Sequence, residues 1–355
     1  MIDRRNLLLL AAGTGAAAVF PTRVRAEIVS AEKFGVRADG ESNSTKALQR
    51  ALDAGSSNGL EISLPAGRLI VDELELPRYA QMRGHTRKTV VVHRDGTLDA
   101  MFTLPKGPII DVQIANASFV GNGLEGEHGF HMNAQPSDSG NGGLWCSQFE
   151  NIRGRGFGGK FLWIRGGAAM PKGTDYPNQF LTLRNVQISR PSSASSRCLS
   201  ITGKVGQFYT EGYCDFQGPN PLSKLSQIGT NIVISREFSN GDAADGGHPI
   251  SDDSPFLINL KLSSQNSHCG ILIDRAGMVS IRESYFENLL DAIRVQSNCV
   301  INLQSSMFAS VMNGVIGNNS VVYHGENVWR GAVFQPYSGN GINFREISTD
   351  VGWPR

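Results

Sequence analysis

Short stretches of alternating apolar and polar residues recur along most of the chain, and this is the pattern of strands with one buried face. Near the C-terminus two sets of residues recur at intervals of 21: Val279, Val300 and Val321, and Asn298, Asn319 and Asn340. A unit of this length without helical periodicity predicts one coil of a parallel β-helix, an all-β solenoid. The pattern of a leucine-rich repeat, the main alternative, is missing. We expect the asparagines to adopt the left-handed conformation at turns and to stack their amides into a ladder.

Similar short strands recur upstream at wider intervals, at residues 130–132, 162–164, 199–201, 232–234, 271–273 and 293–295. Second strands are expected at residues 181–188 and 256–262. The wider intervals predict loops inserted between strands of the same solenoid. These polar inserts span residues 121–143, 166–179 and 240–255.

An amphipathic helix is expected before the coils, over residues 46–54. Ala47, Leu48, Ala51 and Leu52 form an apolar stripe at helical spacing, and the following Gly55 is expected to end the helix. Because a solenoid leaves its terminal coil open, we expect this helix to cover the first coil as a cap.

The residues around this helix carry a recognisable pattern: FGVRADG at 34–40, LPAG at 64–67 and MRG at 82–84. They resemble the N-terminal segment of the pectate-lyase-like right-handed parallel β-helix superfamily, which also places a capping helix between such motifs. Asn43 and Leu69 depart from the superfamily pattern, which has Asp and Tyr there. The resemblance covers residues 32–90 and implies a right-handed parallel β-helix. The superfamily includes polysaccharide lyases, hydrolases, epimerases and phage tailspikes, so the resemblance does not choose among activities.

The first 26 residues have the features of an export signal. Arg4 and Arg5 precede an apolar core that runs to Phe20, and VRA at 24–26 is a small-residue cleavage pattern. The paired arginines resemble a twin-arginine signal, with an ordinary secretory signal or an uncleaved anchor as the alternatives. The expected organisation is a signal peptide at 1–26, a cap with the first coils at 27–105, and coils with inserted loops at 106–355. We therefore expect an exported protein, periplasmic or extracellular.

Charge and cysteine content argue against several other classes. Lys and Arg number 33 and Asp and Glu number 32, which gives a net charge of +1. This balance argues against a protein built to neutralise nucleic-acid phosphates. The five cysteines form no C-x-x-C pair, so neither a zinc motif nor a redox motif is present. After the signal region no stretch of about 18 apolar residues occurs, which argues against stable membrane insertion.

Strand alternation predicts which side chains face outward. If the apolar residues of the strands at 130–132 and 162–164 point inward, His131, Trp163 and Arg165 point outward. Trp163 could then stack on a sugar ring while Arg165 takes a carboxylate. We expect Arg165 to form a basic ladder for an acidic glycan together with Lys204, Arg236 and Arg275. The alternatives are that Trp163 belongs to the core and that these cations are scattered surface charges.

Catalytic groups are expected in the insert at 240–255, which concentrates Asp242, Asp245, His248, Asp252 and Asp253. Two carboxylates that share a site can act as the acid and base of a glycosidase. Asp252 and Asp253 could instead hold Ca²⁺, which in lyases of the superfamily bridges the substrate uronate. A solvated acidic loop is the alternative.

A second group of candidates, Glu211 and Asp215, lies near Tyr209 and Tyr213. We expect these residues on a neighbouring ladder, where a lyase could find a base for the proton next to a carboxylate. His128 and His131 have the spacing of a metal pair, which is unremarkable on a strand.

These observations predict an exported enzyme that cleaves an acidic polysaccharide, by lyase or hydrolase chemistry, in a groove along the β-helix. A uronate C5-epimerase and a non-catalytic glycan-binding or envelope protein are the alternatives. We expect a monomer or a homotrimer, with no nucleic-acid partner.

Overall fold

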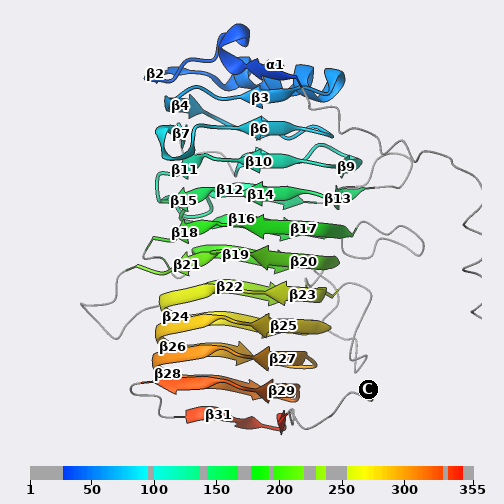
Figure 1. Ribbon diagram of the computed structural model, residues 1–355, viewed down its shortest axis with the longest axis vertical. Helices are drawn as coiled ribbons and strands as arrows, with labels where there is room; N and C mark the ends of the chain where they lie inside the picture. Colours follow the sequence, from blue (N-terminus) through cyan, green and yellow to red (C-terminus); the bar gives the residue numbers. More distant parts are fainter. Residues whose placement is uncertain are drawn as a thin grey trace, which may run out of the picture.

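The computed structural model describes residues 27–94, 100–133, 135, 142–166, 177–191, 193, 195–219, 229–236, 254–330 and 335–346. Within these residues the chain winds into coils that stack along one axis (Figure 1). Strands of successive coils pair in parallel, and the complete coils contribute a strand to each of three faces. The structure therefore confirms the predicted parallel β-helix.

The first face is a sheet of 14 strands that runs the length of the solenoid. Its strands are β1 (Ile28–Ser30), β3 (Glu61–Ser63), β6 (Gln81–Arg83), β9 (Pro108–Ile110), β10 (Gln113–Ala115), β13 (Gly143–Trp145), β14 (Gln148–Glu150), β17 (Asn178–Arg184), β20 (Val205–Glu211), β23 (Phe256–Leu260), β25 (Met278–Arg282), β27 (Val300–Gln304), β29 (Val321–Gly325) and β32 (Asn343–Glu346).

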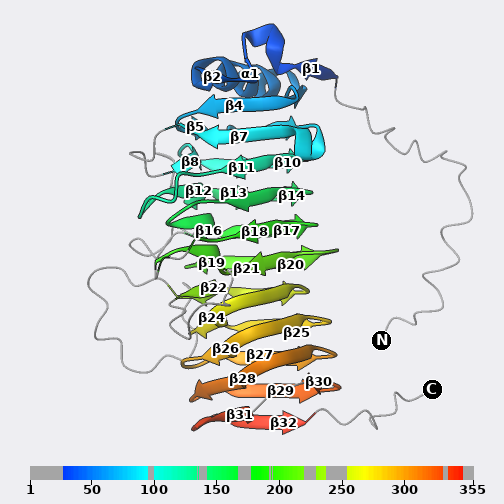
Figure 2. The same cartoon turned by 90° about the vertical axis from the view of Figure 1, so that its left-hand side faces the viewer.

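The remaining 18 strands form one continuous hydrogen-bonded sheet that makes the other two faces. The second face contains β2 (Asp39–Asn43), β4 (Gly67–Val71), β7 (Thr89–His93), β11 (Ser118–Val120), β15 (Arg153–Arg155), β18 (Gln187–Ser189), β21 (Asp215–Gln217) and β30 (Val328–Arg330). The third face contains β5 (Leu74–Glu75), β8 (Ala100–Thr103), β12 (His128–Asn133), β16 (Lys160–Arg165), β19 (Arg197–Thr202), β22 (Thr230–Ser235) and β31 (Gln335–Asn340). Three long strands contribute to both faces: β24 (Ser263–Asp274), β26 (Tyr285–Val295) and β28 (Met307–Asn318). Figure 2 shows the stack from the side.

Asparagines shape the turn between the first and second faces. Asn116, Asn151 and Asn185 have φ values of 58°, 51° and 53°, which is the left-handed region that Asn tolerates. Asn151 donates its amide N–H to Asn116 Oδ1 and Asn185 donates to Asn151 Oδ1, each at 3.1 Å. An amide ladder therefore exists, but at a turn that the repeat analysis did not select.

The asparagines that the repeat analysis did select behave differently. Asn298 and Asn319 have φ values of 50° and 42°, so the left-handed conformation is confirmed for both. Their backbones stack, because Asn298 N donates to Asn319 O and Asn319 N donates to Asn340 O. No amide-to-amide bond joins these three residues, all of which lie in the described part, so the expected side-chain ladder is wrong there.

The repeat itself is confirmed with a shift in register. Val279 pairs with Ile301, whereas Val300 pairs with Val321. The step from β25 to β27 is therefore 22 residues and the step from β27 to β29 is 21. A single inserted residue at a turn changes the coil length without changing which side chains face inward.

The interior is filled by apolar side chains, and its aromatic rings stack along the axis. Phe102 and Phe130 stack with centroids 4.6 Å apart, and Phe286 stacks on Phe308 at 4.9 Å. Phe308 in turn stacks on Trp329 at 4.3 Å. Because parallel coils repeat at roughly 4.8 Å, rings at equivalent positions meet at stacking distance. The core is therefore a column rather than a compact cluster.

The predicted cap is present and is longer than expected. Two short 3₁₀ helices, η1 (Ala31–Phe34) and η2 (Thr86–Lys88), accompany the main helix α1 (Thr45–Asn58), which lies over the first coil (Figure 1). The helix ends at Gly59, whose φ is 67°. Gly55 does not end it: a Cβ there would lie 3.0 Å from Ile62 Cγ1, so this glycine allows close packing on the coil.

No helix among the described residues combines the length and apolar character needed to span a membrane.

Candidate functional site

One ladder of outward side chains runs along the third face. His131, Trp163, Ser200, Val233, Leu272 and Arg294 occupy equivalent positions in successive coils. Their neighbours Leu162 and Ile164 are fully buried, whereas Trp163 and Arg165 are only partly buried. The structure thus places Trp163 and Arg165 outside the core, as strand alternation predicts. Phe161 at the start of the same strand also points into the core, which alternation alone does not predict.

The Trp163 ring lies within a cluster of cationic and imidazole groups. The His131 ring stacks on it with centroids 4.2 Å apart and an interplanar angle of 3°. Lys160 Nζ lies 3.3 Å from the Trp163 ring centroid, and Arg165 Cζ lies 5.6 Å from it. Trp163 Nε1 donates to Thr202 Oγ1 at 2.9 Å, which fixes the plane of the ring. Cations over an indole face are attracted by its quadrupole.

This packing changes the expected role of Trp163. A stacked imidazole leaves no room for an ammonium on its own side of the ring, so His131 and Lys160 cover opposite faces of Trp163. A sugar can stack on the indole only where Lys160 moves aside. A ligand that approaches this cluster therefore meets the Lys160 ammonium before it can contact the Trp163 ring.

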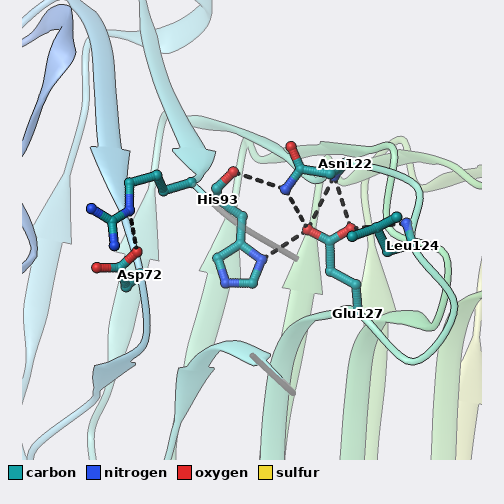
Figure 3. A network of polar contacts seen from close by, with 6 residues as sticks. Asp72, His93, Asn122, Leu124 and Glu127 are labelled. Carbon is teal, nitrogen blue, oxygen red and sulfur yellow. Dashed lines mark hydrogen bonds and ion pairs between the residues drawn. The ribbon is translucent and has the colours of Figure 1, made fainter. Parts of the chain in front are cut away.

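The buried support of this cluster is a carboxylate network in the preceding loop (Figure 3). Glu127 Oε1 lies 2.8 Å from His93 Nδ1, and both side chains are completely buried. The Asn122 and Leu124 backbone N–H groups donate to the same carboxylate. Burial opposes ionisation of Glu127, but the hydrogen bonds outweigh it and hold its pKa below the usual value.

The loop and the cluster are joined through the next residue. His128 follows Glu127 directly, and its Nδ1 accepts a hydrogen bond from Lys160 N at 2.8 Å. The His128 ring also contacts Trp163 edge-to-face, with centroids 5.2 Å apart. Glu127 is therefore a structural anchor that positions the start of β12 and β16.

A second polar cluster lies further along the same face, around Arg294. Asp291 is 1% exposed, and its Oδ2 accepts from Arg294 Nε at 2.9 Å and also from Arg294 Nη2. Asn313 Nδ2 donates to Asp291 Oδ1 at 2.7 Å, so both oxygens are satisfied. His268 Nε2 lies 3.3 Å from Arg294 Nη2. These contacts leave Arg294 Nη1 as a donor toward solvent, on a side chain that is 40% exposed.

The Arg294 cluster was not identified from the sequence. A signal was present: Leu272 and Arg294 are 22 residues apart, as are Asp291 and Asn313, which is the length of one coil. Register from the third-face strands places Arg294 four coils from Trp163, a separation of roughly 19 Å at about 4.8 Å per coil.

The predicted basic ladder is not one ladder. Arg165 is in register with Thr202, Ser235 and Asp274, whereas Arg236 and Arg275 come one residue later in their coils. Lys204 lies a further residue along, at the start of the turn to the first face. Arg275 Nη2 lies 3.4 Å from Asp274 Oδ2, so an acidic residue interrupts the row. The four cations share one edge of the solenoid without forming a regular column, because coil lengths differ.

The predicted carboxylates Glu211 and Asp215 lie on other faces. Glu211 ends β20 on the first face and pairs with Arg184, Nη2 to Oε2 at 2.5 Å. Asp215 begins β21 on the second face, in register with Gln187 and Ser263. The structure therefore does not bring either residue together with Trp163 and Arg165.

Five further residues that the sequence predicts as catalytic or metal-binding groups belong to the insert at 240–255. Asp242, Asp245, His248, Asp252 and Asp253 lie outside the described residues. Among the residues that are described, no group of three or more His, Cys, Asp or Glu side chains has the arrangement of a metal site. His128 and His131 have ring centroids 5.7 Å apart at an angle of 75°.

Comparisons with known proteins agree with the fold. No protein-family model matches the chain. No curated protein matches it either. Among solved structures, the chain is similar to the A-modules of two mannuronan C-5 epimerases from Azotobacter vinelandii. The AlgE6 module is 13% identical with a TM-score of 0.52, over 92% of this chain and 100% of that one. The AlgE4 module is 13% identical with a TM-score of 0.51, over 91% of this chain and 100% of that one. At this identity the similarity shows a shared parallel β-helix fold and nothing about activity.

Proposed function

We propose that the third face binds an acidic glycan and that the protein is an enzyme acting on it, with the Arg294 cluster as the reactive centre. The observation that carries this proposal is Arg294, clamped by buried Asp291 beside His268, on the outward ladder that also holds Trp163. Lys160 and Arg165 supply positive charge at the other end of the same ladder.

The chemistry that suits this cluster is removal of a proton next to a carboxylate. Arg294 Nη1 can take the carboxylate of a uronate and stabilise the negative charge that develops when the neighbouring proton leaves. His268 lies beside Arg294 and is the residue type that accepts such a proton near neutral pH. In a lyase the electron pair left by the proton then forms a carbon–carbon double bond to the next carbon. The bond from that carbon to the glycosidic oxygen breaks, and the oxygen leaves with the other part of the chain and takes up a proton.

Loss of the proton leaves a carbanion next to the carboxylate, and the fate of this carbanion distinguishes a lyase from an epimerase. Return of a proton from the opposite side inverts the carbon without cleavage, which is epimerase chemistry. Hydrolysis would need two carboxylates, and Asp242 and Asp245 remain the proposed pair for it. Residues 1–26 are proposed to direct export, and Ca²⁺ bound at Asp252 and Asp253 remains a proposal.

The test is a paired assay on the chain from Glu27 onward, with acidic and neutral glycans, with and without Ca²⁺. Unsaturated-uronate absorbance and new reducing ends are followed together, and deuterium incorporation from heavy water reports proton exchange without cleavage. Absorbance with reducing ends supports a lyase, and reducing ends alone indicate hydrolysis. Deuterium incorporation alone indicates an epimerase.

Variants then assign the centre. Arg294→Ala and His268→Ala should each remove most of the turnover. Arg282→Ala, which removes one exposed arginine from β25 on the first face, serves as the matched control. Equal turnover in Arg294→Ala and Arg282→Ala would exclude the Arg294 cluster as the reactive centre.

A further inference from the structure

The second face carries two arginines with no acidic neighbour. Arg153 and Arg155 are alternate residues of β15, and Gly154 between them faces the core, where a Cβ would lie 2.4 Å from the Phe161 ring. The adjacent outward positions are Ser118 on β11 and Gln187 on β18 for Arg153. Neither arginine forms a salt bridge with any residue that the structure describes. Two like charges side by side without a counter-charge are unfavourable unless an anion joins them.

These arginines line a hollow in the surface. A cavity of about 340 Å³ lies over β11, β15 and β18, and its wall includes Val90, Ser118, Arg153, Arg155, Gln187 and Ser189. A second cavity of about 390 Å³ adjoins it and shares Ser118, Arg153 and Gln187. Together they continue from the strands to the asparagine turn at Asn116, Asn151 and Asn185. The lining mixes apolar residues such as Val90 and Val120 with polar ones, and the arginines are the only basic side chains among the described residues that line it. Such a surface suits a sugar, which has apolar ring faces and hydroxyl groups, with a negative group for the arginines.

A buried carboxylate completes the ladder two coils further along. Arg153, Gln187 and Asp215 occupy equivalent positions, so Asp215 lies roughly 10 Å from Arg153 along the face. Gln217 Nε2 donates to Asp215 Oδ2 at 2.6 Å. Asp215 Oδ1 has no hydrogen-bond partner although the residue is only 6% exposed. That oxygen is itself covered, so Asp215 forms the end of the ladder and does not offer a free oxygen to a ligand on the surface.

We propose that the second face across β11, β15 and β18 binds a carboxylate-bearing sugar of a glycan. Arg153 and Arg155 hold the carboxylate, and the Gln187 side-chain amide donates hydrogen bonds to hydroxyl groups of the sugar and accepts hydrogen bonds from them. The site is separate from the third face, so it holds glycan whether or not the Arg294 cluster performs chemistry.

Burial raises the pKa of Asp215 above the usual value, against the opposing effect of the polar Ser263, Gln217 and Tyr213 side chains.

The test measures binding of an oligogalacturonate of about three units to the chain from Glu27 onward, by calorimetry. We expect two sites per chain in the wild type. Arg153→Gln with Arg155→Gln should remove one site or weaken it by more than about tenfold, since the bonds lost are charge-assisted. Arg294→Ala should retain this second-face site. Asp215→Asn should leave this site nearly unchanged, because Asp215 lines neither cavity.

Two controls make the result decisive. Arg282→Gln removes one positive charge from the first face. It should leave the number of binding sites unchanged and lower the affinity only slightly, through the smaller net charge of the protein. The single variant Arg155→Gln alters only an exposed side chain, so it keeps the test valid if the double variant fails to fold. Unchanged affinity and stoichiometry in Arg155→Gln and the double variant would overturn the proposal. So would equal losses in Arg282→Gln, or binding of inorganic sulfate without binding of the uronate oligomer. Loss at the arginine pair with normal turnover at Arg294 would support it independently of the proposed activity.

Discussion

Asp291 is a charged side chain buried on the outer side of a strand, and it is tolerated because each of its oxygens has a partner. Arg294 supplies two donors and Asn313 a third. Burying a carboxylate without such partners costs several kcal/mol, whereas a paired one is close to neutral for stability. The pair therefore fixes the direction of Arg294 more than it stabilises the fold.

We expect Asp291→Asn to lower the free energy of unfolding by about 2 kcal/mol, because Arg294 would lose its counter-charge in a partly buried position. Urea denaturation measures the change. Glu283→Gln, which breaks the exposed Lys261–Glu283 pair, is the matched control and should change the free energy of unfolding far less. Similar losses in both variants would show that Asp291 is not a special position.

Glu127 gives a pH-dependent prediction. Because its folded-state pKa is lowered, Glu127 contributes stability above its unfolded pKa, and that contribution is lost as the pH falls through the folded value. The stability difference between the wild type and Glu127→Gln should therefore shrink between about pH 6 and about pH 3. Denaturation midpoints across this range measure it, with Glu41→Gln as a control for losing an exposed carboxylate. A difference that grows on acidification would contradict the sign of the shift.

At the scale of elements, the turn between the first and second faces depends on two properties of asparagine. Asn151 holds a left-handed backbone conformation and also joins the amide ladder above and below it. An apolar residue other than glycine would be strained in the left-handed conformation, and it could not form the amide hydrogen bonds of the ladder.

Two substitutions at Asn151 separate these contributions. Asn151→Gly keeps the left-handed conformation and loses only the amide bonds, so we expect a loss of about 1 kcal/mol. Asn151→Ala should lose about 2 kcal/mol, because the strain is added. Thermal unfolding measures both variants. If the two variants are equally stable, the backbone conformation contributes nothing, and the turn is held by the amides alone.

The cap illustrates how packing overrides a local sequence rule. The glycine at position 55 predicts a helix end, yet α1 continues to Asn58, and Gly55 instead lets the helix pack closely on Ile62. We expect Gly55→Val to destabilise the protein by about 2 kcal/mol through overpacking. Ser57→Val adds the same branched side chain at an exposed position of the helix and should be nearly neutral in the same unfolding measurement.

At the scale of the whole molecule, the solenoid places two independent outward ladders on neighbouring faces. Trp163 and Arg294 belong to the third face, and Arg153 and Asp215 belong to the second. A long glycan could contact both only by passing around the edge between them. Each set of variants should therefore weaken short-oligosaccharide binding at its own face and leave the affinity of the other face unchanged.

Salt dependence tests whether charge drives binding at either face. Affinity for an acidic oligosaccharide should fall as NaCl is raised from about 0.05 M to about 0.5 M, since screening shortens the range of exposed charges. Neutral oligosaccharides of the same length should show little change in the same titration. Binding of the acidic ligand that is insensitive to salt would mean that stacking and neutral hydrogen bonds dominate.

The sequence by itself determined the fold class, the position of the cap and the outward direction of Trp163 and Arg165. These follow from local alternation and from a repeat, and neither depends on which residues meet across coils. Only the tertiary structure decided which outward residues are neighbours. Loops of different length shift the register between coils, so Arg294 aligns with Trp163 while Lys204 and Arg236 fall out of line, and Glu211 and Asp215 separate onto different faces. Side-chain packing decided how accessible the Trp163 ring is, because His131 and Lys160 cover it. It also decided the role of Gly55, which packs on Ile62 inside the helix although a glycine at that position predicts a helix end.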